Sequence, residues 1–106
     1  MKWLAPAISS LLFCSGVVAG EPSAVRQAEL RYLLAQDCGS CHGLTLKGGL
    51  GPALTPPALN GKPTEFIQLT ILHGRPGTAM PPWRGILSED DSRWLAERLL
   101  AGETQP

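Results

Sequence analysis

Two cysteines and a histidine lie within five residues of each other, in the segment Cys38-Gly39-Ser40-Cys41-His42. A two-residue gap between cysteines, followed at once by histidine, is the pattern of covalent haem attachment. Two thiols can add to the two vinyl groups of haem, and the adjacent imidazole then lies under the iron and can ligate it. The sequence therefore predicts one haem c, attached through Cys38 and Cys41, with His42 as an iron ligand.

Three other uses of this motif remain open from the residues alone. A thioredoxin-like redox pair has the same spacing but normally lies where a strand meets a helix, and no strand pattern precedes Cys38. A structural zinc site needs four ligands, which Cys38, Cys41, His42 and His73 would supply, although Cys41 and His42 would crowd one small ion. A simple disulfide would close a loop too short to constrain the unfolded chain much.

The first twenty residues have the composition of an export signal. Lys2 precedes a largely apolar stretch, and the small residues Ala19 and Gly20 suit cleavage by signal peptidase. The apolar stretch is short and interrupted for a membrane span, and an uncleaved N-terminal anchor is the alternative. We therefore expect residues 1–20 to be a signal peptide and residues 21–106 to be a single exported cytochrome domain without a membrane span.

The mature domain is small enough to need support beyond its own core. Domains of this size bury too little surface to be more than marginally stable, and they usually rely on disulfides, a metal or a large prosthetic group. Cys38 and Cys41 are the only cysteines in residues 21–106. A porphyrin is therefore the expected source of additional core.

Charge argues against two classes of partner. The chain has nine basic and nine acidic residues, and they form no basic run and no basic helix face. A clustered basic surface is typical of nucleic-acid binding, and polybasic segments are typical of attachment to acidic lipids. We therefore expect neither nucleic acid nor a lipid surface as the partner.

Good helix formers fill residues 22–36, directly before the cysteine motif. Ser23 can cap this helix, and the apolar spacing gives it one hydrophobic face. We expect that face to contain Val25, Ala28, Tyr32 and Ala35, with Leu30, Leu33 and Leu34 beside it.

Two more helices are expected later in the chain, and no strand shows a clear alternating pattern. Pro63 suits the first turn of a helix over residues 63–72. Ser88 can cap a last helix with Asp91 reaching back to it, and Gly102 can end that helix. The buried side of the last helix is expected to contain Trp94, Leu95, Leu99 and Leu100. The fold class is therefore all-α.

Glycine and proline break the chain into two loops between these helices. Residues 43–61 form a loop that is long for so small a domain, which is expected where a loop wraps a ligand. This loop could bring a backbone carbonyl to the second nitrogen of His42, as iron-ligating histidines normally require. Residues 73–85 form the second loop.

Met80 is the strongest candidate for a second axial ligand. It is the only methionine left after removal of the signal, and Pro81 and Pro82 stiffen the loop that carries it. A lone methionine is more often core filler, but fillers usually lie on regular elements. Paired histidine and methionine ligation fills both axial positions and suits electron transfer. His73 is the rival ligand, although a histidine at a helix end has an ordinary electrostatic role.

The motifs C-G-S-C-H-G, G-P-A-L and M-P-P-W, with their flanking helices, resemble class I cytochromes c over the whole mature chain. The resemblance implies three to four helices around one haem, with the first and last helices crossing. By matching position it implies that Pro52 accepts the hydrogen bond of His42 and that Met80 is the sixth ligand. Trp83 would lie against the haem edge, donate to a propionate or belong to the ordinary core.

The longer segments C-G-S-C-H-G-L-T-L-K-G-G-L-G-P-A-L-T-P and G-R-P-G-T-A-M-P-P-W are similar to the cytochrome c-55X family. These are small cytochromes encoded with the haem d nitrite reductase of denitrifying bacteria. The resemblance implies a monomeric periplasmic one-electron carrier, not an enzyme, which donates to that nitrite reductase. Two alternatives are a role in haem d assembly for the reductase, and a haem sensor or enzyme with a labile sixth ligand.

Overall fold

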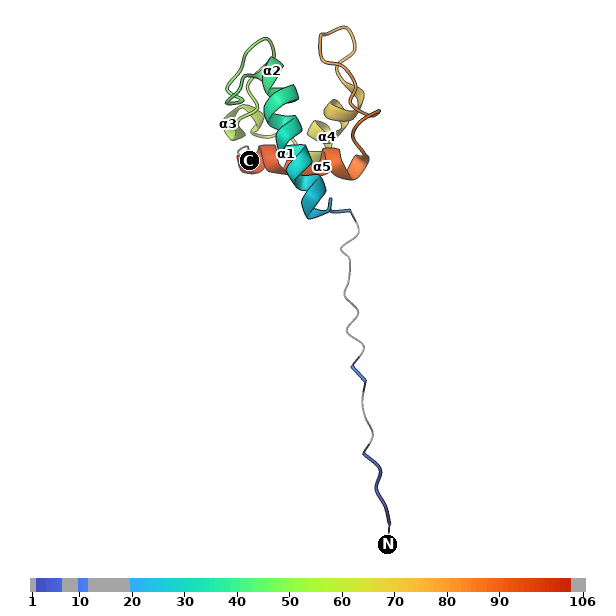
Figure 1. Ribbon diagram of the computed structural model, residues 1–106. Helices are drawn as coiled ribbons and strands as arrows, with labels where there is room; N and C mark the ends of the chain where they lie inside the picture. Colours follow the sequence, from blue (N-terminus) through green and yellow to red (C-terminus); the bar gives the residue numbers. More distant parts are fainter. Residues whose placement is uncertain (1, 7–9, 12–19, 104–106) are drawn as a thin grey trace.

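The computed structural model describes residues 2–6, 10–11 and 20–103 (Figure 1). Its helices account for all regular structure in this part of the chain, which contains no strand, and the all-α class is confirmed. The elements are α1 (Ala24–Leu33), the π-helical turn η1 (Leu34–Cys38), α2 (Gly39–His42), α3 (Pro56–Leu59), α4 (Thr64–His73) and α5 (Glu89–Ala101).

The expected signal peptide cannot be followed as a structural unit, because residues 1, 7–9 and 12–19 lie outside the described residues. Among the residues that are described, no helix is both long and apolar enough to cross a lipid bilayer.

The helix before the cysteine motif begins as predicted. The Ser23 hydroxyl accepts a hydrogen bond from the Arg26 N–H at 3.2 Å, which satisfies one of the free donors of the first turn. The helix then runs through η1 into α2 and ends only at His42. A π-helical turn is wider than an α-helical one, is rare overall and occurs frequently at functional sites, and this one ends at Cys38, the first cysteine of the motif.

The prediction of which side chains of α1 are buried is wrong. Val25 is 73% exposed and Tyr32 is 69% exposed, whereas Leu30 and Leu34 are fully buried. Helices that cross bury only a narrow stripe at the crossing, and here the stripe contains Leu30, Leu34 and the charged Arg26. The apolar spacing misled the prediction because one interface position is an arginine.

Helix α5 has the capping that the sequence predicts. The Ser88 hydroxyl accepts from the Asp91 N–H at 3.0 Å, and the Asp91 carboxylate accepts from the Ser88 N–H at 3.1 Å, which is a complete capping box. The helix ends at Gly102, whose φ of +76° is in the left-handed region. Of its expected core residues, Trp94, Leu95 and Leu99 are buried and Leu100 is partly buried.

Helices α1 and α5 cross, as the resemblance implies (Figure 1). Leu30 belongs to the same buried cluster as Trp94 and Leu95. The Arg31 guanidinium also lies 4.9 Å from the centroid of the Trp94 ring, within the range of a cation–π contact. Helix α4 also packs against α5, and the buried Gln68 amide donates to the Glu89 carbonyl at 2.9 Å.

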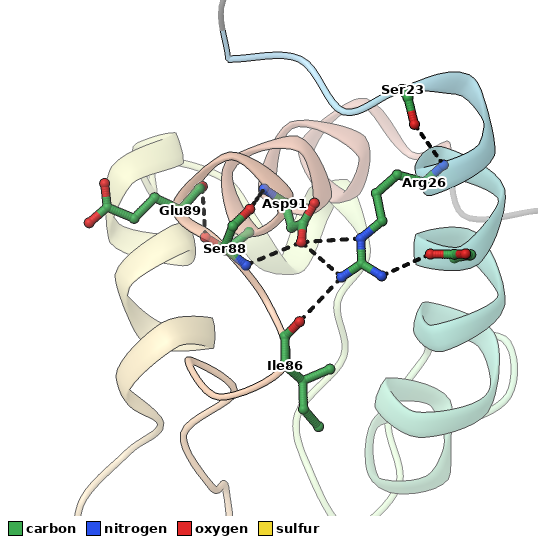
Figure 2. A network of polar contacts seen from close by, with 8 residues as sticks. Ser23, Arg26, Ile86, Ser88, Glu89 and Asp91 are labelled. Atoms are coloured by element: carbon green, nitrogen blue, oxygen red, sulfur yellow. Dashed lines mark hydrogen bonds and ion pairs between the residues drawn. The ribbon is translucent and has the colours of Figure 1, made fainter.

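One carboxylate joins the two crossing helices (Figure 2). Two guanidinium nitrogens of Arg26 donate to Asp91 Oδ2 at 3.2 and 2.9 Å, and one of them also donates to the Ile86 carbonyl at 3.2 Å. Burial by itself would raise the pKa of Asp91, but the hydrogen bonds from Arg26 and Ser88 outweigh it and hold that pKa below its ordinary value. We call the Arg26–Asp91 contact the helix clasp.

Replacing Asp91 by asparagine is expected to lower the free energy of unfolding by about 2 kcal/mol at pH 7, because charged hydrogen bonds are each worth roughly 1.5–3 kcal/mol. The pKa of Asp91 in the folded state lies below its value of about 3.9 in the unfolded state. Asp91 therefore contributes its full share of the free energy of unfolding above the unfolded-state pKa, and this share is lost as the pH falls through the folded-state pKa. The difference between Asp91→Asn and wild type should therefore shrink on acidification, as measured by urea unfolding.

Asp90→Asn is the matched control for this prediction. Asp90 also lies in the first turn of α5 but is exposed, so its replacement changes only the interaction with the helix dipole. Equal losses for Asp90→Asn and Asp91→Asn, or a loss for Asp91→Asn that does not change with pH, would contradict the role assigned to the clasp.

Candidate functional site

A cavity of about 600 Å³ lies between η1, α2 and the loop after α2 on one side, and α4 and the Met80 loop on the other. Its volume is in the range of about 300–1,000 Å³ that is usual for ligand and cofactor pockets. The cavity brings together every predicted site residue, which are Cys38, Cys41, His42, Pro52, Met80 and Trp83. The rival ligand His73 is exposed at the end of α4 and is not part of the lining.

The imidazole of His42 is fixed by a backbone carbonyl. Its Nδ1 atom lies 2.7 Å from the oxygen of Pro52. A carbonyl oxygen can only accept, so this contact assigns the proton to Nδ1 and leaves Nε2 free as a lone-pair donor toward a metal. The expected hydrogen bond is present, and it gives His42 the tautomer and the fixed ring that an iron ligand needs.

The loop from Gly43 to Pro52 is bound to the C-terminal end of α2. The N–H of Gly51 donates to the Cys41 carbonyl at 2.7 Å, and the N–H of Gly48 donates to the His42 carbonyl at 2.8 Å. These bonds satisfy carbonyls that a helix end leaves free. At Gly51 a Cβ atom would lie 2.9 Å from two ring atoms of His42. Only glycine therefore allows the chain to pass this close to the imidazole and to place Pro52 against it.

The two thiols are free and differ in exposure, with Cys38 partly buried and Cys41 exposed. Burial raises the pKa of the Cys38 thiol to about 11, and the nearby Asp37 carboxylate adds to the effect. Redox-active dithiols depend on a thiol whose pKa is lowered, so the environment of Cys38 argues against a thioredoxin-like pair.

The zinc alternative receives no support from the geometry. No three metal-ligating side chains converge on one point within residues 20–103 or the described parts of the N-terminal segment. His73, the fourth ligand that this alternative needs, lies outside the cavity that contains the other three residues. A closed tetrahedral site would need all four side chains around a single ion.

Met80 is carried by a loop whose ends are both attached to α4. The N–H groups of Trp83 and Arg84 donate to the carbonyls of Ile71 and Leu72 at 3.1 and 3.2 Å, so the returning arm is hydrogen-bonded to the last turn of the helix. Prolines before Trp83 stiffen the same arm. The side chain of Trp83 lines the cavity and also packs against the buried core, which fits two of the three roles considered for it, contact with the haem edge and membership of the core.

The remaining cavity wall is largely the hydrophobic core itself. Leucines and isoleucines of η1, α3, α4 and α5 line it, and the wall also contains Leu54, Leu59 of α3 and Phe66, which the sequence did not single out. An apolar cavity with two thiols, an imidazole with a free Nε2 and a thioether on its wall fits a haem, which is flat, largely apolar and attached at two points. Lys62 and Arg75 add positive charge to the lining, and Asp37 adds one negative charge.

Comparison with known proteins gives an independent assignment. Residues 25–97 match the family described as cytochrome c oxidase, cbb3-type, subunit III. Cytochrome c55X of Pseudomonas aeruginosa is 60% identical over 104 residues, which cover 98% of this chain and 87% of that protein.

Two solved structures extend the comparison. The c-type cytochrome NirC is 66% identical and superposes with a TM-score of 0.78 over 80% of this chain and 100% of the NirC chain. The dihydro-heme d1 dehydrogenase NirN, solved in complex with DHE, is 36% identical with a TM-score of 0.61, over 65% of this chain but only 15% of NirN.

The family model spans most of the described domain, and the likeness to cytochrome c55X extends over nearly the whole chain. Such proteins carry covalently bound haem and take part in electron transport. The chain therefore belongs to the class I c-type cytochromes, in the cytochrome c55X family.

Proposed function

We propose that the protein is a one-electron carrier with a single haem c, attached through Cys38 and Cys41 and ligated by His42 and Met80. The observation that carries this proposal is the His42–Pro52 hydrogen bond at 2.7 Å, which leaves Nε2 of His42 free on the wall of a cavity that Met80 also lines. The haem, when bound, supplies the Fe(III)/Fe(II) couple.

The residues around the cavity determine whether the Fe(III)/Fe(II) couple serves electron transfer or catalysis. If His42 and Met80 both hold the iron, no coordination site would remain for a substrate, and this pair of ligands would raise the reduction potential. The apolar walls around the cavity keep water away from most of the site, and the hydrogen-bonded loops hold both ligands in place. These properties favour an electron carrier over an enzyme.

We propose a periplasmic location, with residues 1–20 as the signal peptide and residues 21–106 as a monomeric mature domain. The nitrite reductase of denitrification is the proposed electron acceptor. Electron-transfer partners usually meet over small, transient interfaces, which suits a small cytochrome.

A role in maturation of haem d is the second candidate, and one observation favours it. The relative NirN is named for the dehydrogenation of dihydro-heme d1, and it contains a segment that resembles this chain. A cytochrome of this kind could therefore exchange electrons during cofactor assembly instead of during nitrite reduction.

Absorption spectra of the purified protein in both redox states, with and without carbon monoxide, test the proposed ligation. A carrier with His42 and Met80 in place is expected to bind carbon monoxide poorly at neutral pH and to show the weak sulfur-to-iron band when oxidised. Ready binding of carbon monoxide would instead support the alternative of a sensor or enzyme with a labile ligand.

Deletion of the gene distinguishes the two physiological roles. If the protein is the electron donor, the purified nitrite reductase should contain its d haem and be active with an artificial donor, while nitrite reduction in cells is slow. If the protein serves assembly, the reductase should lack the d haem.

A further inference from the structure

Met80 follows a tight turn built from Arg75, Pro76, Gly77 and Thr78. The Thr78 N–H donates to the Arg75 carbonyl at 3.0 Å, which closes the turn. Gly77 has a φ of +78°, and proline followed by left-handed glycine is the preferred central pair of a type II turn. The turn thus has a conformation that its own sequence favours.

Both backbone polar groups of Met80 are bound to this turn. The Met80 N–H donates to the Thr78 hydroxyl at 3.3 Å, and the Met80 carbonyl accepts from the Arg75 N–H at 3.2 Å. The Thr78 hydroxyl in turn donates to the Arg75 carbonyl at 2.6 Å. Thr78 therefore connects the start of the turn to the backbone of Met80 through one oxygen atom.

The other side of the loop leaves little room for Met80 to move. Gly74 has a φ of +65°, and a Cβ atom there would lie 2.7 Å from the Met80 oxygen and from the carbonyl carbon of Pro81. The backbone of residues 80–82 is thus packed directly on Gly74. Within residues 74–80, which the structure describes in full, Thr78 is the one residue whose side chain forms a hydrogen bond.

We propose that Thr78 is a positioning residue for the sixth ligand. Its hydroxyl holds the backbone of Met80 at the cavity wall, and so it limits how often the thioether moves away from the iron. This inference rests on the proposed role of Met80 as an iron ligand. It adds a residue whose side chain does not itself ligate the metal.

The test uses the mature holoprotein with Thr78→Val, which replaces the hydroxyl by a methyl group, and Thr78→Ser, which keeps the hydroxyl. Both hydrogen bonds of the hydroxyl are lost in Thr78→Val, so detached Met80 should become about tenfold more populated. The rate of carbon monoxide binding to the reduced protein should rise by about that factor, and the sulfur-to-iron band should weaken. Thr78→Ser should behave like wild type.

Thr45→Val controls for the loss of a surface hydroxyl, because Thr45 is exposed in the turn after His42 and does not line the cavity. Thr78→Ala replaces Thr78→Val if the valine variant yields too little holoprotein. Equal behaviour of wild type, Thr78→Val and Thr78→Ala would overturn the role of Thr78, as would equal defects in Thr78→Val and Thr78→Ser. Met80→Ala is measured in parallel: if it keeps the sulfur-to-iron band, the ligand assignment itself fails, which is a separate result.

Discussion

Replacing both Cys38 and Cys41 by alanine is expected to yield a colourless polypeptide with the mass of the bare chain and without a cooperative unfolding transition. The reason is that residues of the hydrophobic core form much of the wall of the cavity of about 600 Å³. At about 24 cal/mol per Å³, a persistent void of this size would cost on the order of 10 kcal/mol. Entry of water lowers that cost, but the total stability of a domain is only about 5–15 kcal/mol.

The measurement is expression with haem-attachment machinery, followed by mass spectrometry, absorption and thermal unfolding monitored by circular dichroism. Ser40→Ala is the matched control, because Ser40 lies between the two cysteines and is exposed, and its hydroxyl donates to the Asp37 carbonyl at 2.8 Å and makes only a long contact of 3.9 Å with Cys41 Sγ. It should retain haem and stability. A coloured double variant that unfolds at the wild-type temperature would contradict covalent attachment at Cys38 and Cys41.

Replacing Met80 by alanine is expected to lower the reduction potential, to remove the sulfur-to-iron band and to let carbon monoxide bind readily. Axial ligands tune haem potentials over a range of about 0.8 V, and the thioether favours the reduced state. Loss of the ligand should therefore have a larger effect on the potential than any other single replacement in the loop. Potentiometric titration of the purified holoprotein measures it.

His73→Ala serves as the control for this second prediction, because His73 is the other candidate ligand. The side chain is exposed and lies outside the cavity lining, so its removal should leave the spectrum and the potential unchanged. The opposite pattern, in which Met80→Ala is silent and His73→Ala shifts the potential, would show that the chain rearranges to bring His73 to the iron.

Helix ends were the most predictable part of the fold, because their chemistry is local. Ser88, Asp91 and Gly102 act within a few residues of their own positions, and the structure has them as predicted. The buried side of α1 depends instead on a partner helix far along the chain. Arg26 belongs to that interface because it is hydrogen-bonded to Asp91 of α5. The spacing of apolar residues within α1 cannot predict this contact with a distant helix.

Short and strained segments were not predictable. Helix α3 has only four residues and lies in a proline-rich loop, where sequence patterns are too short to be read. Leu46 is buried with a φ of +58°, a conformation that a leucine rarely adopts and that only the surrounding contacts can impose.

The site was predictable to the extent that it is a local motif. Cys38, Cys41 and His42 follow from spacing, and Met80 follows from its isolation in a stiff loop. Pro52 was expected through family resemblance, since it lies ten positions after His42 at the far end of a loop. The hydrogen bonds of Thr78 depend on the three-dimensional closure of the turn. In the sequence, the proline and glycine before Thr78 predict a turn, but they do not predict that the turn binds the backbone of Met80.

The helix clasp has a consequence for the order in which the chain folds. Its two partners, Arg26 and Asp91, are 65 positions apart, so the contact cannot form until nearly the whole polypeptide has crossed the membrane through which we propose it is exported. The walls that α4 and α5 contribute to the cavity also follow Cys38 and Cys41 in the chain. If the chain is exported from its N-terminus as proposed, Cys38 and Cys41 would reach the far compartment before these walls can form, and the order of residues would leave both thiols accessible for haem attachment.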